Sequence, residues 1–141
     1  MGASGKIQTL ATNAADEGNN GFTLSTDTGS RPQFLLAESS TTKAQSTAST
    51  QMAVGTWYHV VGTFDDANDR ARIYVNGSLE RESSYTGRIT YASSRDLLLG
   101  KQVKTYLQSS RFLQGSLDEV AVYGSELPAA TVKEHYDAGR G

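Results

Sequence analysis

The chain has 141 residues, of which 13 are Lys or Arg and 15 are Asp or Glu, so its formal net charge is -2. A chain of this length is expected to form one domain around one core, and a charge so close to neutral argues against nucleic acid as a partner. The sequence contains no cysteine, which excludes disulfides and thiolate metal sites. No run approaches the ~20 apolar residues of a membrane span, and the first residues lack the basic and apolar regions of a signal peptide. We therefore expect no membrane insertion.

Short apolar groups alternate with turn residues along most of the chain, which predicts an all-β domain. The C-terminal segment 128–139 alone predicts a helix, with Pro128 in its first turn and Gly139 as its stop. The Ser/Thr-rich segment 39–50 suits a solvated strand, so we place no domain boundary there. The expected strands are 5–12, 21–27, 33–38, 43–50, 56–65, 70–76, 78–83, 96–101 and 117–123.

The strongest local signal is a hairpin centred on Asn76-Gly77, because a two-residue type I′ turn needs positive φ at both positions. Asn76-Gly77-Ser78 also spells a glycosylation sequon, but the turn already accounts for both residues. In segment 56–65 both alternate sets contain large apolar groups, so this strand is expected to be covered on both sides. We assign Trp57, Tyr74 and Tyr123 to the core.

Three segments, 55–80, 96–101 and 112–139, together resemble the concanavalin A-like, laminin G-like sandwich domain of secreted bacterial proteins. The resemblance extends from Lys6 to Gly139. It implies a jelly-roll β-sandwich of two curved antiparallel sheets, usually non-catalytic, with ligands at a rim or on the concave sheet and often a bound Ca²⁺. The residues that carry it are Trp57, His59, Phe64, Asp65, the hairpin 74–77, Gly115, Leu117, Asp118, Glu119, Val120 and Tyr123.

One departure from the family pattern concerns the first strand. Family members begin with a further Trp-containing strand ahead of the segment that aligns with 5–12, and here it is missing. Its absence would leave an unpaired sheet edge, which is a known route to homo-oligomers. We expect a trimmed chain, a shortened first strand, or a second copy that covers the edge.

Catalysis is not expected. Glycosidases of this fold class place two carboxylates about 5 to 9 Å apart, and their alternating Glu-x-Asp-x-x-Glu pattern is absent. Asp118 and Glu119 are adjacent, so on a strand their side chains leave opposite faces. His59 and His135 accompany no nucleophile-elbow motif, and packing with a hydrogen bond explains both.

Two acidic loops offer the oxygen ligands that Ca²⁺ prefers. Neither has the ligand spacing of an EF-hand, and Asp and Asn are also common in turns because they hydrogen-bond their own backbone. Both interpretations stay open, and Ca²⁺ is the one candidate cofactor. The candidate ligands are Asp16, Glu17, Asn19 and Asn20 in the first loop and Asp65, Asp66, Asn68 and Asp69 in the second.

Sugar recognition uses aromatic rings that stack on a pyranose and planar polar groups that hold its hydroxyls. Both kinds gather in the connections that flank segment 96–101. A structural interpretation also stands, because Tyr is common in strands and Arg stems cover apolar surface. The candidate ligand-binding residues are Tyr85, Arg88, Tyr91, Arg95, Tyr106, Gln108 and Arg111.

The sequence thus favours a non-catalytic module for glycan recognition or adhesion, carried by a larger extracellular or cell-surface protein. Its expected partner is a glycan or a cell-surface or matrix protein. The alternative is a structural or protein-interaction domain that forms oligomers through the exposed edge, and a glycoside hydrolase is the remote alternative.

Overall fold

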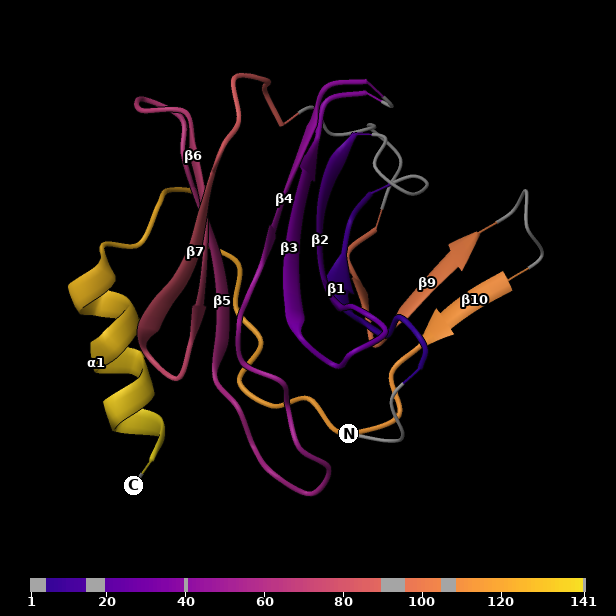
Figure 1. Ribbon diagram of the computed structural model, residues 1–141. Helices are drawn as coiled ribbons and strands as arrows, with labels where there is room; N and C mark the ends of the chain where they lie inside the picture. Colours follow the sequence, from indigo (N-terminus) through magenta and orange to yellow (C-terminus); the bar gives the residue numbers. More distant parts are fainter. Residues whose placement is uncertain (1–4, 15–19, 40, 90–95, 105–108, 141) are drawn as a thin grey trace.

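Two antiparallel sheets face each other and a single helix follows them in this computed structural model, which describes residues 5–14, 20–39, 41–89, 96–104 and 109–140 (Figure 1). One sheet has the order β4-β3-β2-β1-β8, the other β5-β6-β7, and β9 and β10 form a separate hairpin. This confirms the expected all-β jelly-roll sandwich with one short C-terminal helix. The elements are β1 (Thr9–Thr12), β2 (Gly21–Thr26), β3 (Pro32–Ala37), β4 (Lys43–Thr47), β5 (Val60–Asp65), β6 (Arg70–Val75), β7 (Ser78–Ser84), β8 (Leu98–Leu99), β9 (Lys101–Lys104), β10 (Ser109–Phe112) and α1 (Ala129–Gly139).

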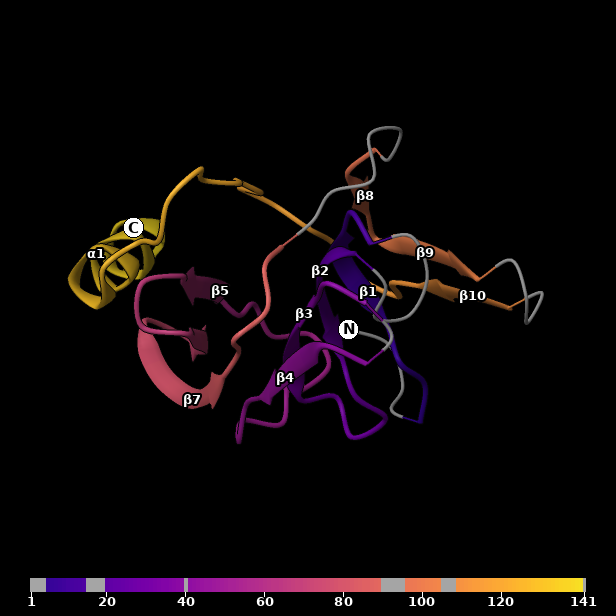
Figure 2. The same ribbon diagram turned by 90° about the horizontal axis from the view of Figure 1, so that it is seen from above.

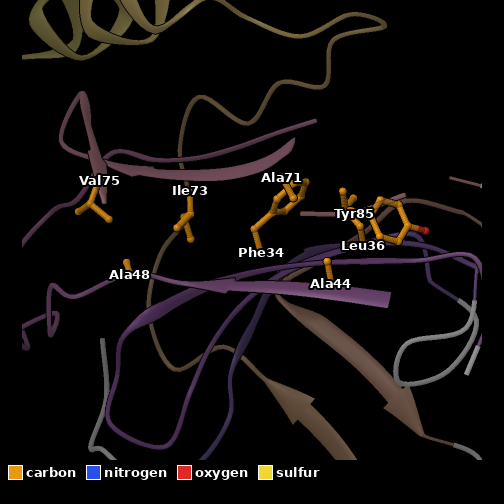
Figure 3. Packing of buried hydrophobic residues seen from close by; sticks show 8 residues of the cluster. All are labelled: Phe34, Leu36, Ala44, Ala48, Ala71, Ile73, Val75 and Tyr85. Carbon is orange, nitrogen blue, oxygen red and sulfur yellow. The ribbon is translucent and has the colours of Figure 1, made fainter. Parts of the chain in front are cut away.

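The core lies between β3 and β4 on one side and β6 on the other (Figure 3). Alternation along the strands produces it, because every second residue of a strand points to the same face. On β6, Ala71, Ile73 and Val75 face the core and are almost fully buried, while Arg72 between them reaches carboxylates on the outer face. The cluster consists of Phe34, Leu36, Ala44, Ala48, Ala71, Ile73, Val75 and Tyr85.

The hairpin between β6 and β7 is confirmed. Asn76 has φ 51° and Gly77 has φ 77°, as a type I′ turn requires. The turn also supports the helix, because a Cβ at Gly77 would lie 3.1 Å from the ring of Tyr136 on α1. Helix α1 lies against the outer face of the three-stranded sheet (Figures 1 and 2), and Val132 is its fully buried anchor.

Strands form within each expected segment except the last, residues 117–123. That prediction was wrong: the segment carries a strand-like alternation, but no described strand pairs with it, and Glu119 has φ 50°, which interrupts an extended run. A strand forms only where its backbone N–H and C=O groups can hydrogen-bond to a neighbouring strand. The segment instead runs from β10 to α1 without secondary structure until the helix begins.

Two core assignments were also wrong. Trp57 is 67% exposed and Tyr123 is 51% exposed, whereas Tyr74 is buried as expected. Trp57 precedes β5, which is an edge strand of the three-stranded sheet. Within the described residues no further strand lies beside β5 to cover Trp57. The sandwich therefore does not depend on Trp57, since its core lies between β3, β4 and β6.

Candidate functional site

Tyr85, the first residue of the expected sugar-binding group, is part of the core. It is 2% exposed, its ring packs edge-on against Phe64 at 5.3 Å, and its hydroxyl donates a 3.0 Å hydrogen bond to the carbonyl of Arg88. A ring in this position cannot stack on a sugar. The sequence could not distinguish the two roles, because a tyrosine that follows a strand can either pack in the core or stack on a ligand.

The rest of that group is only partly described. Arg88 is exposed after β7, and Arg111 is half-buried on β10, where burial lowers the pKa of its guanidinium. Tyr91, Arg95, Tyr106 and Gln108 lie outside the described residues.

The acidic turn between β5 and β6 has a structural role. Asp65 accepts hydrogen bonds from the backbone and side-chain nitrogens of Asn68 at 3.1 and 2.8 Å, and Asp69 has φ 55°. Where the chain is described, no three Asp, Glu or His side chains come together in a way that could hold a metal. Asp65, Asp66 and Asp69 thus form no such cluster of carboxylates, and a Ca²⁺ site in this loop stays a prediction. The first acidic loop, with Asp16, Glu17 and Asn19, lies outside the described residues.

An ion-pair network ties the segment before α1 to the three-stranded sheet. Arg72 on β6 contacts Glu82 at 2.7 Å, Glu126 at 2.6 Å and Asp65 at 3.5 Å. The bond from Arg72 holds Glu126 over the outer face of the sheet. Tyr74 is buried on this face, and burial raises the pKa of the Tyr74 hydroxyl. Arg72 therefore fixes where the helix and the preceding segment lie.

Aromatic and histidine side chains gather on the outer face beside α1. The ring of His59 lies 6.0 Å from that of Tyr136, and the ring of Tyr123 lies 6.0 Å from that of His135. Trp57 precedes His59 by two residues and is largely exposed. We call His59, Tyr123, His135 and Tyr136, together with Trp57 for its nearness to His59 in the sequence, the aromatic face. Sequence analysis missed it because it assigned Trp57 and Tyr123 to the core.

The electrostatics of this face depend on His59. Burial lowers the pKa of its imidazole below the ordinary value of 6.5, and the nearby His135 lowers it further. Its Nδ1 atom is buried and has no hydrogen-bond partner among the described residues. The imidazole of His59 is therefore neutral at pH 7 where it packs against α1, and its buried Nδ1 makes no hydrogen bond within the described residues.

This arrangement makes the fold sensitive to mild acid. Because the folded state binds the proton of His59 more weakly than the unfolded chain does, the free energy of unfolding should fall as the pH drops below about 6.5. Urea denaturation at low micromolar protein, at pH 7 and between about pH 6.5 and 5, measures the effect. His59→Phe keeps a ring against Tyr136 and should show a flatter profile. An unchanged slope in that variant would assign the pH dependence to another group.

Comparison with known proteins gives a clear family match. A family model described as Concanavalin A-like lectin/glucanases superfamily matches residues 2–133. A comparison with curated protein sequences finds no match. Within the part of the chain that the structure describes, no helix has the length and apolar character needed to cross a membrane.

Solved structures of three proteins illustrate the fold. The CBM40 of the Ruminococcus gnavus IT-sialidase aligns with a TM-score of 0.75 and 16% identity over 95% of this chain and 76% of that one, and so does its complex with α2,3-sialyllactose. An S-layer domain-containing protein from Clostridium thermocellum gives 0.53 and 19% over 96% and 65%. The botulinum neurotoxin serotype G binding domain gives 0.64 and 18% over 95% and 31%. The chain thus spans less than two thirds of the last two proteins. At these low identities the structural likeness shows a shared fold alone.

Proposed function

Because this chain belongs to the concanavalin A-like lectin/glucanases superfamily, we propose that residues 1–141 are a single laminin G-like domain that recognises carbohydrate without catalysis. Structures with the same fold include a carbohydrate-binding module in complex with sialyllactose and a toxin binding domain. Asp118 and Glu119 lie in a segment without secondary structure, where the Asp118 carboxylate accepts the backbone N–H of Glu119 at 2.9 Å and so serves the local turn of the chain. Binding is therefore the activity that the residues favour.

The aromatic face is the proposed contact surface. Trp57 and Tyr123 are both more than half exposed, and exposed aromatic rings stack on the apolar face of a pyranose. His135 beside Tyr123 supplies a hydrogen-bond donor for sugar hydroxyls. The single observation that carries the proposal is the exposure of Trp57, because an exposed indole offers a large flat surface on which a sugar ring can stack.

The proposed location is the cell surface or the extracellular space, as one module of a larger protein. In support, the fold is shared with an S-layer domain-containing protein and with a module of a sialidase. Its partner there would be a glycan on a cell or in a matrix. A glycan array probed with and without Ca²⁺ identifies that partner.

Trp57→Ala is expected to weaken binding of the best array ligand about tenfold or more, which corresponds to ~1.4 kcal/mol. Isothermal titration calorimetry measures the loss, with Tyr123→Ala as a second test of the same face. Phe112→Ala is the matched control, because Phe112 is 55% exposed on β10, outside the aromatic face. Equal losses in Trp57→Ala and Phe112→Ala, or no saccharide bound at millimolar concentration, would refute the proposal.

A further inference from the structure

We propose that Asn76 is a site of spontaneous deamidation, and that its isoaspartate product loosens the contact between the β6–β7 turn and α1. The chain contains two Asn-Gly pairs, Asn20-Gly21 and Asn76-Gly77. A glycine that follows an asparagine has no side chain to shield its backbone nitrogen, so both pairs have the sequence that this reaction needs. The structure distinguishes the two pairs, and the proposal holds whatever ligand the domain binds.

The reaction joins a backbone nitrogen to a side-chain carbon. The nitrogen of Gly77 attacks Cγ of Asn76, a new C–N bond forms, and Nδ2 leaves as ammonia with the proton from Gly77. Water then opens the cyclic imide. Addition of water at Cγ gives aspartate, whereas addition at the former main-chain carbonyl gives isoaspartate, in which the chain continues through Cγ. Water enters, ammonia leaves, and no atom is oxidised or reduced.

The reacting atoms of Asn76-Gly77 are available in the folded chain. Among the described residues, neither the backbone N–H of Gly77 nor Nδ2 of Asn76 makes a hydrogen bond. Oδ1 of Asn76 accepts the backbone N–H of His59 at 3.0 Å. A donor at this oxygen stabilises the negative charge that develops on it when Cγ is attacked. Both turn residues are partly exposed, so water reaches them.

The backbone nitrogen of the other Asn-Gly pair is engaged in a sheet. Gly21 is the first residue of β2 and is paired with Ala37 on β3. In line with this ladder, the N–H of Asp27 donates to the carbonyl of Arg31 at 2.9 Å, and hydrogen-bonded pairs recur at every second residue of an antiparallel ladder. The Gly21–Ala37 pair is therefore of the bonded kind. Attack by the nitrogen of Gly21 must first break this bond.

The β6–β7 turn makes two contacts that an isoaspartate would change. The N–H of Asn76 donates to the carbonyl of His59 at 2.8 Å, and the Asn76 side chain accepts the return bond, for which a strand residue uses its own carbonyl. On the side of α1, a Cβ at Gly77 would lie 3.3 Å from Cα of Lys133. Isoaspartate adds one backbone carbon between residues 76 and 77, so a two-residue turn cannot keep both contacts.

Peptide mapping by mass spectrometry tests the site. In the folded chain, kept in mildly alkaline buffer, Asn76 is expected to convert at least about tenfold faster than Asn20, because a ladder bond of ordinary strength must first break at Gly21. An isoaspartate methyltransferase should label the product at residue 76. In urea, where no sheet engages Gly21, the two rates should converge. Conversion of Asn20 as fast as Asn76 in the folded chain, or conversion of Asn76 in urea alone, would overturn the proposal.

Hydrogen exchange measures the consequence for α1. The isoaspartate form, separated by chromatography, is expected to exchange the hydrogen-bonded amides of α1 at least about tenfold faster than the parent chain. Asn76→Asp serves as the comparison, because it adds the same charge, keeps an acceptor for the N–H of His59 and leaves the backbone path unchanged. It should exchange like the parent. Parent-like protection of α1 in the isoaspartate form, or equally fast exchange in Asn76→Asp, would contradict the loosening of α1 by the altered backbone.

Discussion

Leu36→Ala is expected to lower the free energy of unfolding by about 2–5 kcal/mol, one of the two largest effects in this chain. Leu36 on β3 is 0% exposed and lies in the cluster that joins the two sheets. Its removal leaves a cavity between β3 and β6 that the two sheets cannot close without moving toward each other. The chain has no cysteine, so no disulfide compensates for the loss.

Leu79→Ala is the matched control, because the same side chain on β7 is 49% exposed. It is expected to change the free energy of unfolding by less than about 1 kcal/mol. Urea denaturation followed by circular dichroism measures both variants under one set of conditions. Equal losses would mean that the core does not lie between the sheets as described.

The strands and the hairpin could be predicted because their causes are local. Asn-Gly specifies a type I′ turn whatever surrounds it, and the observed φ values at Asn76 and Gly77 match that expectation. Alternation on β6 likewise separates Ile73, which is buried, from Arg72, which reaches carboxylates on the outer face. These features need only neighbours along the chain.

Burial of the aromatic residues could not be predicted in the same way. Trp57 and Tyr123 have sequence surroundings typical of core residues, but burial needs a partner strand from elsewhere in the chain. Tyr85 shows the converse: it was expected in a loop site and is buried against Phe64. The candidate site is therefore the aromatic face and not the loops predicted from the sequence, because residue type alone does not predict which aromatic rings other parts of the chain bury.

The acidic turn illustrates a second limit of sequence analysis. Asp65 has the chemistry of a Ca²⁺ ligand, and only the structure shows its carboxylate bonded to Asn68 and near Arg72. One residue type serves a turn and a metal site equally well. Geometry decides between the two, and geometry here favours the turn.

Gly62→Ala is expected to destabilise the fold by about 1–3 kcal/mol, the second large effect. Gly62 lies in the middle of β5, and a Cβ there would lie 2.5 Å from Cγ of Phe34 on the facing sheet. Phe34 is itself buried in the core cluster, so its ring cannot move away without disturbing Leu36 and Ile73. The glycine is needed for this close approach of two sheets. Gly124→Ala is the control, because a Cβ there meets no atom within 4 Å.

A double-mutant cycle separates this contact from a general intolerance of β5. Phe34→Leu replaces the ring that the new methyl group would contact by a smaller side chain. The combined variant should therefore lose less stability than the sum of the two single changes. The expected coupling is on the order of 0.5–3 kcal/mol, measured by urea denaturation of all four proteins. Additive losses would show that Gly62→Ala destabilises the fold for a reason other than a clash with Phe34. The close packing of β5 against β3 would then need another explanation.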